Sequence, residues 1–222
     1  SSAASDVYKR QDYAAIKNGS YGKLMKAYYA KQDAEKLSGK GDTSQKLTLM
    51  KTSADSLKKS ADALNDSSLW GKKKIKKKDE KTGEEIEVED YDWDKITKAV
   101  KSFVEDYNDV VKEAGESNTK DVLRNASWMT GMTDKNSNML AKIGITIGKG
   151  NKLELDEDAL KQADISSLKT VFTGYNSFVS KISQKATGIS NAANRASATY
   201  TNNGTYSKTD SSLTSSKIDK EV

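Results

Sequence analysis

Apolar residues recur every three or four positions along two long stretches of this chain, and no proline interrupts either one. The first stretch covers 43–65 and the second covers 93–114. Steps of three and four residues place side chains on one face of an α-helix, and a chain without proline can keep such helices long. The sequence therefore predicts two long amphipathic helices that pack antiparallel on each other. The alternative for either stretch is a helix that binds a partner.

A third apolar stripe predicts one long helix over about 165–200. Its apolar positions mostly keep heptad spacing, with Lys185 as a polar interruption, and they become small near the end of the helix. Small side chains bury little area, so helix packing within the chain is expected to be weak over 187–200. The residues predicted to form helix-packing or partner-binding seams on the three helices are Leu47, Met50, Leu57, Leu64, Ile96, Val100, Phe103, Tyr107, Val171, Tyr175, Phe178, Ile182 and Ile189.

Two short hairpins are predicted between the helices. The segment 143–155 has isoleucines at alternate positions, a glycine-containing turn at 148–151 and two alternating leucines on the return strand. Such alternation around a short turn is typical of a β-hairpin. Asp156 follows at a position suited to a helix N-cap, so the hairpin is expected to continue into a short helix that ends near 163.

The other predicted hairpin is an insertion at 71–91, with its strands within about 72–89. Lysines dominate its first half and acidic residues its second half. A turn at 79–83 would place lysines opposite glutamates, and Ile75 opposite Ile86 or Val88. Opposite charges across a hairpin stabilise each other, so we expect a self-neutralising hairpin that projects from the end of the helix pair.

The lysine run Lys72–Lys78 also suggests a site for nucleic acid or anionic lipid. That function would require the lysines to be unpaired, and the net charge of the whole chain is only +5. The run contains no aromatic residue of the kind that stacks on bases. A polyanion-binding site is therefore the less favoured interpretation, and no nucleic-acid partner is predicted.

The rest of the chain divides by composition. Residues 1–42 form a tyrosine-rich N-terminal segment in which a helix is predicted at about 20–37. Residues 43–200 are predicted to form a helical, leg-like domain. Residues 201–222 are a polar C-terminal coil. Within the leg, 115–142 should form one or two short helices, broken near Gly131, that cover the 143–155 hairpin.

The composition favours a thin helical body over a thick globular core. Hydrophobic residues make up 35% of the chain and charged residues 31%, so the core is expected to be about one seam wide. The predicted fold class is mainly α: an elongated antiparallel helical bundle or coiled coil with two small β-hairpins.

The residue types used most often in catalysis and metal binding are missing. The chain has no cysteine and no histidine, which removes thiolate and imidazole chemistry. The glycines of 143–155 do not follow the order of a phosphate-binding loop, and Asp156–Asp158 lacks the calcium-loop pattern. No catalytic, cofactor-binding or metal-binding residues are predicted. No apolar run reaches the length of a membrane span. The chain begins without methionine, so a trimmed or processed start is expected, and the sequence leaves open whether a signal peptide precedes it.

Several motifs, in order along 93–222, resemble the C-terminal half of the flagellar hook-associated protein 2 (filament cap) family. The match lies in a helix with an FV–YN pattern, the hairpin with its following helix, a short VFTG sequence, and the terminal coil. In this chain they are Val100–Asn108, Ile143–Ile145, Leu153, Leu155–Asp156, Leu160, Ala163, Val171–Gly174, Gly204–Asp210, Leu213 and Ile218–Lys220.

The resemblance implies a leg of long helices and small hairpins, a terminal coil that orders on assembly, and no catalytic residue. In the family, subunits form a ring at the filament tip and guide flagellin folding. Large outer domains separate the two halves of the family's leg, whereas this chain has only the charged hairpin at 71–91. The resemblance is therefore to a divergent or reduced relative.

The expected function is that of a non-enzymatic structural or assembly protein of the bacterial flagellum, located outside the cell. It would act by helix-mediated self-association or docking, with a second copy or a flagellin-like protein as partner. The exposed parts of the seams, especially over 171–196, would carry the contacts. The alternatives are a cytoplasmic helical adaptor or export chaperone and, with less support, a polyanion-binding protein that uses Lys72–Lys78.

Overall fold

A computed structural model describes residues 41–78 and 83–199 of this chain. The helix predicted at 20–37 and the coil predicted at 201–222 lie outside these residues. In chain order the elements are α3 (Ser44–Asn65), the 3-10 turn η1 (Ser67–Trp70), β1 (Lys73–Lys78), β2 (Glu85–Asp90), α4 (Trp93–Gly115), α5 (Lys120–Lys135), α6 (Ser137–Ala141), β3 (Ile145–Ile147), the turn η2 (Lys149–Asn151), β4 (Leu153–Leu155), α7 (Glu157–Gln162), α8 (Ile165–Phe172) and α9 (Phe178–Thr199).

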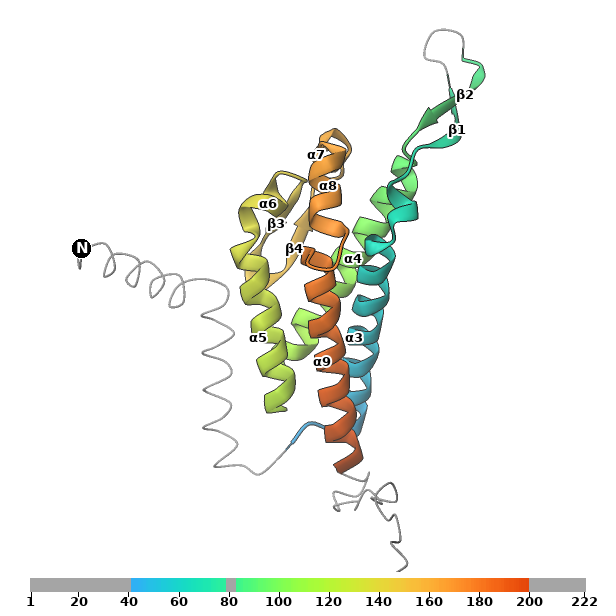
Figure 1. The fold of residues 1–222 in the computed structure, drawn as a ribbon. Coiled ribbons are helices and arrows are strands. Elements are labelled where there is room, and N and C mark those ends of the chain that lie inside the picture. The colour runs from blue at the N-terminus through green and yellow to red at the C-terminus, as the bar shows by residue number, and fades with distance from the viewer. Residues whose placement is uncertain (1–40, 79–82, 200–222) are drawn as a thin grey trace, which may run out of the picture.

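The four longest helices run side by side along an elongated bundle (Figure 1). Helix α3 packs on α4 and α9, and α5 packs on the same two helices from the other side. Consequently α3 and α5 occupy diagonal positions. The β1–β2 hairpin stands at one end of the bundle, and α5 begins and α9 ends at the opposite end, which we call the lower end. The predicted mainly-α fold with two small hairpins is confirmed.

The apolar stripe of α3 is buried along its whole length. Its six stripe positions, spaced by three and four residues, are at most 2% exposed. The N-cap of this helix is Thr43, whose hydroxyl accepts a hydrogen bond from the backbone N–H of Lys46. The sequence predicts pairing of this stripe with that of α4 alone. In the structure it is shared, because α9 lies along α3 as well.

Two hydrogen-bonded serine–aspartate pairs, which we call clasps, fix the register between α3 and α9. The hydroxyl of Ser190 donates to the carboxylate of Asp55 at 2.6 Å, and that of Ser183 donates to Asp62 at 2.7 Å. The two aspartates and the two serines are each seven residues apart, and they pair in opposite order, as antiparallel helices require. Each aspartate also pairs with the lysine four residues before it in α3. These clasps flank the apolar seam and align it.

Helix α4 connects the bundle to the small β3–β4 hairpin. The side chain of Asn108 donates to the backbone carbonyl of Leu153 at 2.9 Å and accepts from the N–H of the same residue at 2.6 Å. The buried Tyr107 donates its hydroxyl to Thr133 of α5 at 2.9 Å. Burial raises the pKa of Tyr107, so its hydroxyl stays protonated and acts as a donor. Adjacent residues of α4 thus hold a strand and a neighbouring helix.

Both hairpins have the predicted strands. In β3–β4, Ile145 faces Leu155 and Ile147 faces Leu153. In β1–β2, Ile75 faces Val88. Four lysines face acidic residues, as Lys76 faces Glu87, whereas Lys77 faces Ile86. Residues 79–82, within the predicted turn of this hairpin, lie outside the described residues. The hairpin projects beyond the helices, as expected.

The single helix predicted over about 165–200 is wrong. The chain forms α8 and α9 with a break at 173–177, and Gly174 in the break has a φ of +99°. The hydroxyl of Thr173 caps α8 by donating to the carbonyl of Lys169, and the N–H of Gly174 donates to Asn65 at the end of α3. Glycine takes this left-handed conformation without the steric cost that a side chain adds. The break moves Tyr175 out of the seam.

The break predicted near Gly131 is also wrong. Helix α5 continues through this glycine, because residues on both sides of it, Met129, Thr130 and Thr133, are buried against the bundle. The helix ends instead near Asn136, whose side chain donates to the carbonyl of Met132 at 2.7 Å. Tertiary burial here outweighs the weak helix propensity of a single glycine.

The start of the β3–β4 hairpin depends on a glycine at 144. Gly144 has a φ of +79°, and a Cβ there would lie 2.6 Å from the carbonyl oxygen of Asp156 and 2.9 Å from the backbone nitrogen of Leu160. These are backbone atoms, so they cannot move aside as a flexible side chain would. We expect Gly144→Ala to lower the free energy of unfolding by about 3 kcal/mol, measured by urea denaturation.

Gly150→Ala is the matched control. Gly150 has a similar φ of +70°, but nothing lies within 4 Å of the position of its Cβ. Only the left-handed conformation is penalised, so the expected loss is about 1 kcal/mol. Equal losses in the two variants would contradict the close approach of α7 to Gly144.

Candidate functional site

The predicted seam residues lie in the core of the bundle. Apart from Tyr175, all of them are at most 4% exposed. Tyr175 lies in the break between α8 and α9 and is 83% exposed. The buried seam side chains contact other parts of the same chain, so any partner must bind to what these helices leave outside.

An exposed aromatic residue marks the face formed by α5 and α9. Trp128 of α5 is 52% exposed, and the ammonium of Lys185 in α9 lies 4.2 Å from the centroid of its ring. A cation over a Trp face is attracted by the ring quadrupole, which holds both side chains in place. Close packing supports the same face, because a Cβ on Gly188 would meet the side chain of Asn125 at 2.6 Å.

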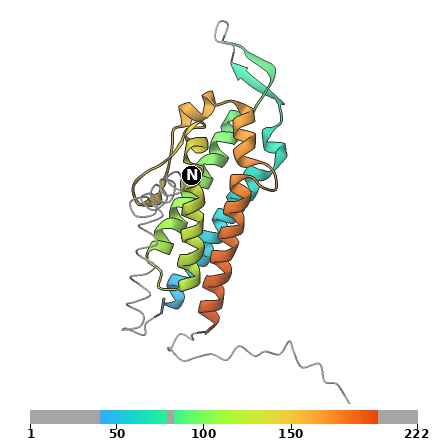
Figure 2. The same cartoon turned by 60° about the vertical axis from the view of Figure 1, so that its left-hand side comes forward.

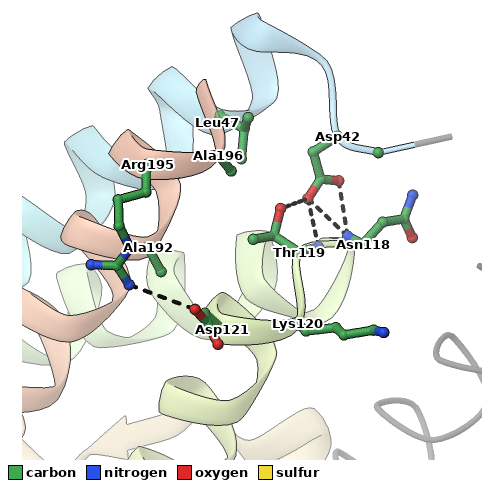
Figure 3. A pocket seen from close by; sticks show the side chains of 10 residues that line it. Asp42, Leu47, Asn118, Thr119, Lys120, Asp121, Ala192, Arg195 and Ala196 are labelled. Atoms are coloured by element: carbon green, nitrogen blue, oxygen red, sulfur yellow. Dashed lines mark hydrogen bonds and ion pairs between the residues drawn. The ribbon is translucent and has the colours of Figure 1, made fainter. Parts of the chain in front are cut away.

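A pocket of about 480 Å³ lies at the lower end of the bundle, where α3 and α5 begin and α9 ends (Figure 3). Its apolar wall is made by the buried Leu47 with two alanines of α9, and polar side chains of α5 and α9 surround it. The lining residues are Gly41, Asp42, Leu47, Asn118, Thr119, Lys120, Asp121, Ala192, Arg195 and Ala196.

Asp42 is a buried charged side chain of this lower pocket, and it accepts several hydrogen bonds. Its side chain is 1% exposed and its oxygens accept hydrogen bonds from the N–H groups of Asn118 and Thr119 at 2.8 to 2.9 Å. The hydroxyls of Ser117 and Thr119 donate to it at 2.6 and 2.8 Å. Thr119 is the N-cap residue of α5, but its side chain makes no capping hydrogen bond to the helix. Asp42, 77 positions earlier in the chain, instead holds the backbone N–H of Thr119 itself.

The lower pocket is poorly suited to acid–base chemistry. Burial raises the pKa of Asp42, but hydrogen bonds from Ser117, Asn118 and Thr119, with the charge of Lys46 at 3.4 Å, outweigh burial and leave the pKa below its ordinary value. Asp42 is therefore ionised at neutral pH and its lone pairs are engaged, so it cannot serve as a general acid. It acts as a structural clasp between α3 and α5.

The second carboxylate of the pocket is exposed and paired. Asp121 lies 2.9 Å from Arg124 on its own helix and 3.6 Å from Arg195 of α9, and its side chain is 45% exposed (Figure 3). Ion pairs with this exposure contribute little to stability. Asp121 and Arg195 remain exposed to solvent at the rim of the pocket.

Within residues 41–78 and 83–199, no group of three or more acidic side chains is arranged to hold a metal ion. In the same residues no helix combines the length and the apolar character needed to cross a bilayer.

Sequence reasoning missed the polar contacts that connect distant helices. Ser183 and Ser190 of α9 lie at heptad spacing that matches Asp62 and Asp55 of α3. That matched spacing was the available signal. Nothing local connects Asp42 with 117–119, because the contact requires the finished fold.

Residues 117–221 of the chain match the family model described as flagellar hook-associated protein 2 C-terminus. The matched region begins at the loop that Asp42 clasps and includes α5 to α9. It confirms the family resemblance predicted from the motifs. No curated protein and no solved structure matches the chain.

The Asp42 clasp predicts a pH-dependent loss of stability. Because the pKa of Asp42 is lower in the folded chain than in the unfolded chain, its stabilisation is complete above the ordinary aspartate pKa and is lost as the pH falls through the lowered value. We expect Asp42→Asn to cost about 2 kcal/mol near pH 7 and much less near pH 2, by urea denaturation.

Asp121→Asn provides the control for this measurement. It removes a carboxylate from the same pocket, but one that is exposed and paired only with arginines. The expected cost is below about 1 kcal/mol. If Asp42→Asn cost no more than this control, Asp42 would not be a structural clasp.

Proposed function

We propose that this chain, whose residues 117–221 belong to the family of flagellar hook-associated protein 2 C-termini, is a structural, cap-like protein of a flagellum. It works outside the cell and carries out no reaction. It acts by docking the outer faces of its helices onto a second copy or a flagellin-like protein. The observation that carries the proposal is the family match over the region that contains α5 and α9.

The α5–α9 face is the proposed docking surface. Trp128 supplies a large aromatic side chain on a rigid helix, and aromatic residues of this kind often dominate binding energy at protein interfaces. Lys185 adds positive charge beside Trp128, and Arg195 pairs with Asp121 further along the same two helices. Both basic residues lie within the 171–196 region that the sequence predicts to carry contacts. The face is held together by Gly188 packing on Asn125, so a partner would meet a preformed surface.

The location of the protein tests the proposal at the level of function. The full chain should be recovered with flagellar filaments sheared from cells of the source organism, detected by immunoblotting beside a cytoplasmic marker that stays with the cells. Retention of the chain with the cytoplasmic marker would contradict the proposal and favour a cytoplasmic adaptor or export chaperone.

The docking surface is tested by Trp128→Ala in the full chain. Because Trp128 is half exposed and on the docking face, we expect recovery with filaments to fall about tenfold or more, while Tm changes by less than about 4 °C. Co-sedimentation with filaments and thermal unfolding measure the two quantities.

Leu49→Ala is the matched control for Trp128→Ala. Leu49 is 51% exposed on α3, diagonally across the bundle, so its loss should leave filament binding unchanged. Equal losses of binding in the two variants would remove the assignment of docking to the α5–α9 face.

A further inference from the structure

The β1–β2 hairpin is a two-stranded sheet that stands clear of the helices (Figures 1 and 2). In the described part of the chain, each of its strands pairs with the other and with no third strand. Alternate backbone N–H and C=O groups therefore point outward along both long edges. Such edges are templates for pairing with another strand.

The β3–β4 hairpin shows how a strand edge of this chain is covered when it packs against the helices. Strand β4 lies against the bundle, and Asn108 of α4 takes both backbone hydrogen-bonding groups of Leu153. The β1–β2 hairpin has a different position, beyond the end of the bundle, where helices do not cover it.

Charge is sorted by strand in β1–β2. Strand β1 reads KKIKKK and strand β2 reads EIEVED. On one face, three lysines lie opposite three glutamates, in the pairs Lys74–Glu89, Lys76–Glu87 and Lys78–Glu85. One outer edge of the sheet is therefore basic and the other is acidic.

We propose that the basic β1 edge of one molecule pairs with the acidic β2 edge of a second copy of this chain, continuing the sheet from molecule to molecule. This contact would repeat the lysine–glutamate pairing that already holds each hairpin together, with each lysine gaining an acidic neighbour on its second side. Pairing of β1 with β1, or of β2 with β2, would place like charges opposite each other and is disfavoured.

The opposite face of the sheet adds an apolar strip to this contact. Ile75 and Val88 face each other and are partly exposed, and Ile86 beside them is 40% exposed. An added strand would cover Ile86, which lies on the acidic strand. Charges on the edges disfavour pairing with unrelated strands, so a strand of opposite charge is the one expected to cover the apolar strip.

The proposed contact joins two different surfaces, so it is heterologous. A contact of this kind closes into a ring if its rotation allows and otherwise propagates as a filament. It deepens the proposed function, because it names one contact through which copies of this chain would associate. Each hairpin edge is short, so a single contact should be weak and should disappear at high salt.

The test asks which strand edges meet between molecules, and it uses the absence of cysteine from the chain. One full-length variant carries Lys76→Cys on β1, and the other carries Glu87→Cys on β2. Each variant keeps the lysine–glutamate pairs Lys74–Glu89 and Lys78–Glu85 of its hairpin. Each molecule has one thiol, so every cross-link between thiols joins two molecules.

The two variants, one of them ¹⁵N-labelled, are mixed and treated with a short bis-maleimide cross-linker, and the linked dimers are distinguished by mass spectrometry. At about 0.05 M salt, dimers that join Cys-substituted β1 to Cys-substituted β2 should exceed dimers that join like strands at least about tenfold over the statistical ratio, because only unlike edges carry opposite charges. The excess should be lost at about 0.5 M salt.

Three results would overturn the inference. A statistical ratio of the cross-linked dimers would mean that the charges on the strands do not decide the contact. An excess of dimers that join like strands would mean that β1 pairs with β1 or β2 with β2. Absence of cross-linked dimers at low salt would mean that the edges do not associate.

Failure here is distinct from failure of the proposed function. Recovery of the chain with filaments, together with a statistical ratio of cross-linked dimers, would remove the hairpin contact and leave the flagellar role in place. Preferential β1–β2 cross-linking of a chain that never reaches filaments would do the reverse.

Discussion

The packing of α3 against α9 is the contact on which the rest of the structure depends. It brings together the first and last long helices of the described chain. All the other long helices and both hairpins lie between these two helices in the sequence. Such a long-range contact costs the conformational entropy of closing a long loop, and a continuous apolar seam is needed to offset that cost. The seam is supplied by apolar positions at heptad spacing and is kept in register by the clasps of Asp55 with Ser190 and Asp62 with Ser183.

The same packing decides what is left for other molecules. With α3 on one side of α4 and α9, helix α5 occupies the other side, and Trp128 remains on the surface beside Lys185. At the lower end, Asp42 ahead of α3 accepts hydrogen bonds from the N–H groups of Asn118 and Thr119, which lead into α5. A rigid body of this kind costs little ordering on binding, which suits a protein whose proposed work is to dock.

The two hairpins show that similar elements can have different roles. Both have the strands that alternation and turn residues predicted, because these signals are local. The β3–β4 hairpin is apolar and is tied to α4 through Asn108, so it belongs to the core. The β1–β2 hairpin is charged on both strands and stands outside, so its stability comes from cross-strand charge pairs, and its edges stay available.

The sequence by itself determined the two long amphipathic helices α3 and α4, both hairpins and the cap at Asp156, since periodicity, turns and capping act within a few residues. It predicted a break near Gly131 that is absent, because burial of the flanking residues keeps α5 continuous. It missed the break at 173–177, which the cap of Thr173 and the left-handed Gly174 decide. Only the tertiary structure decided that α3 shares its seam with α9, that Asp42 reaches α5, that Trp128 stays outside and that Tyr175 leaves the seam. These outcomes depend on contacts between residues far apart in the chain, and no local spacing specifies such partners.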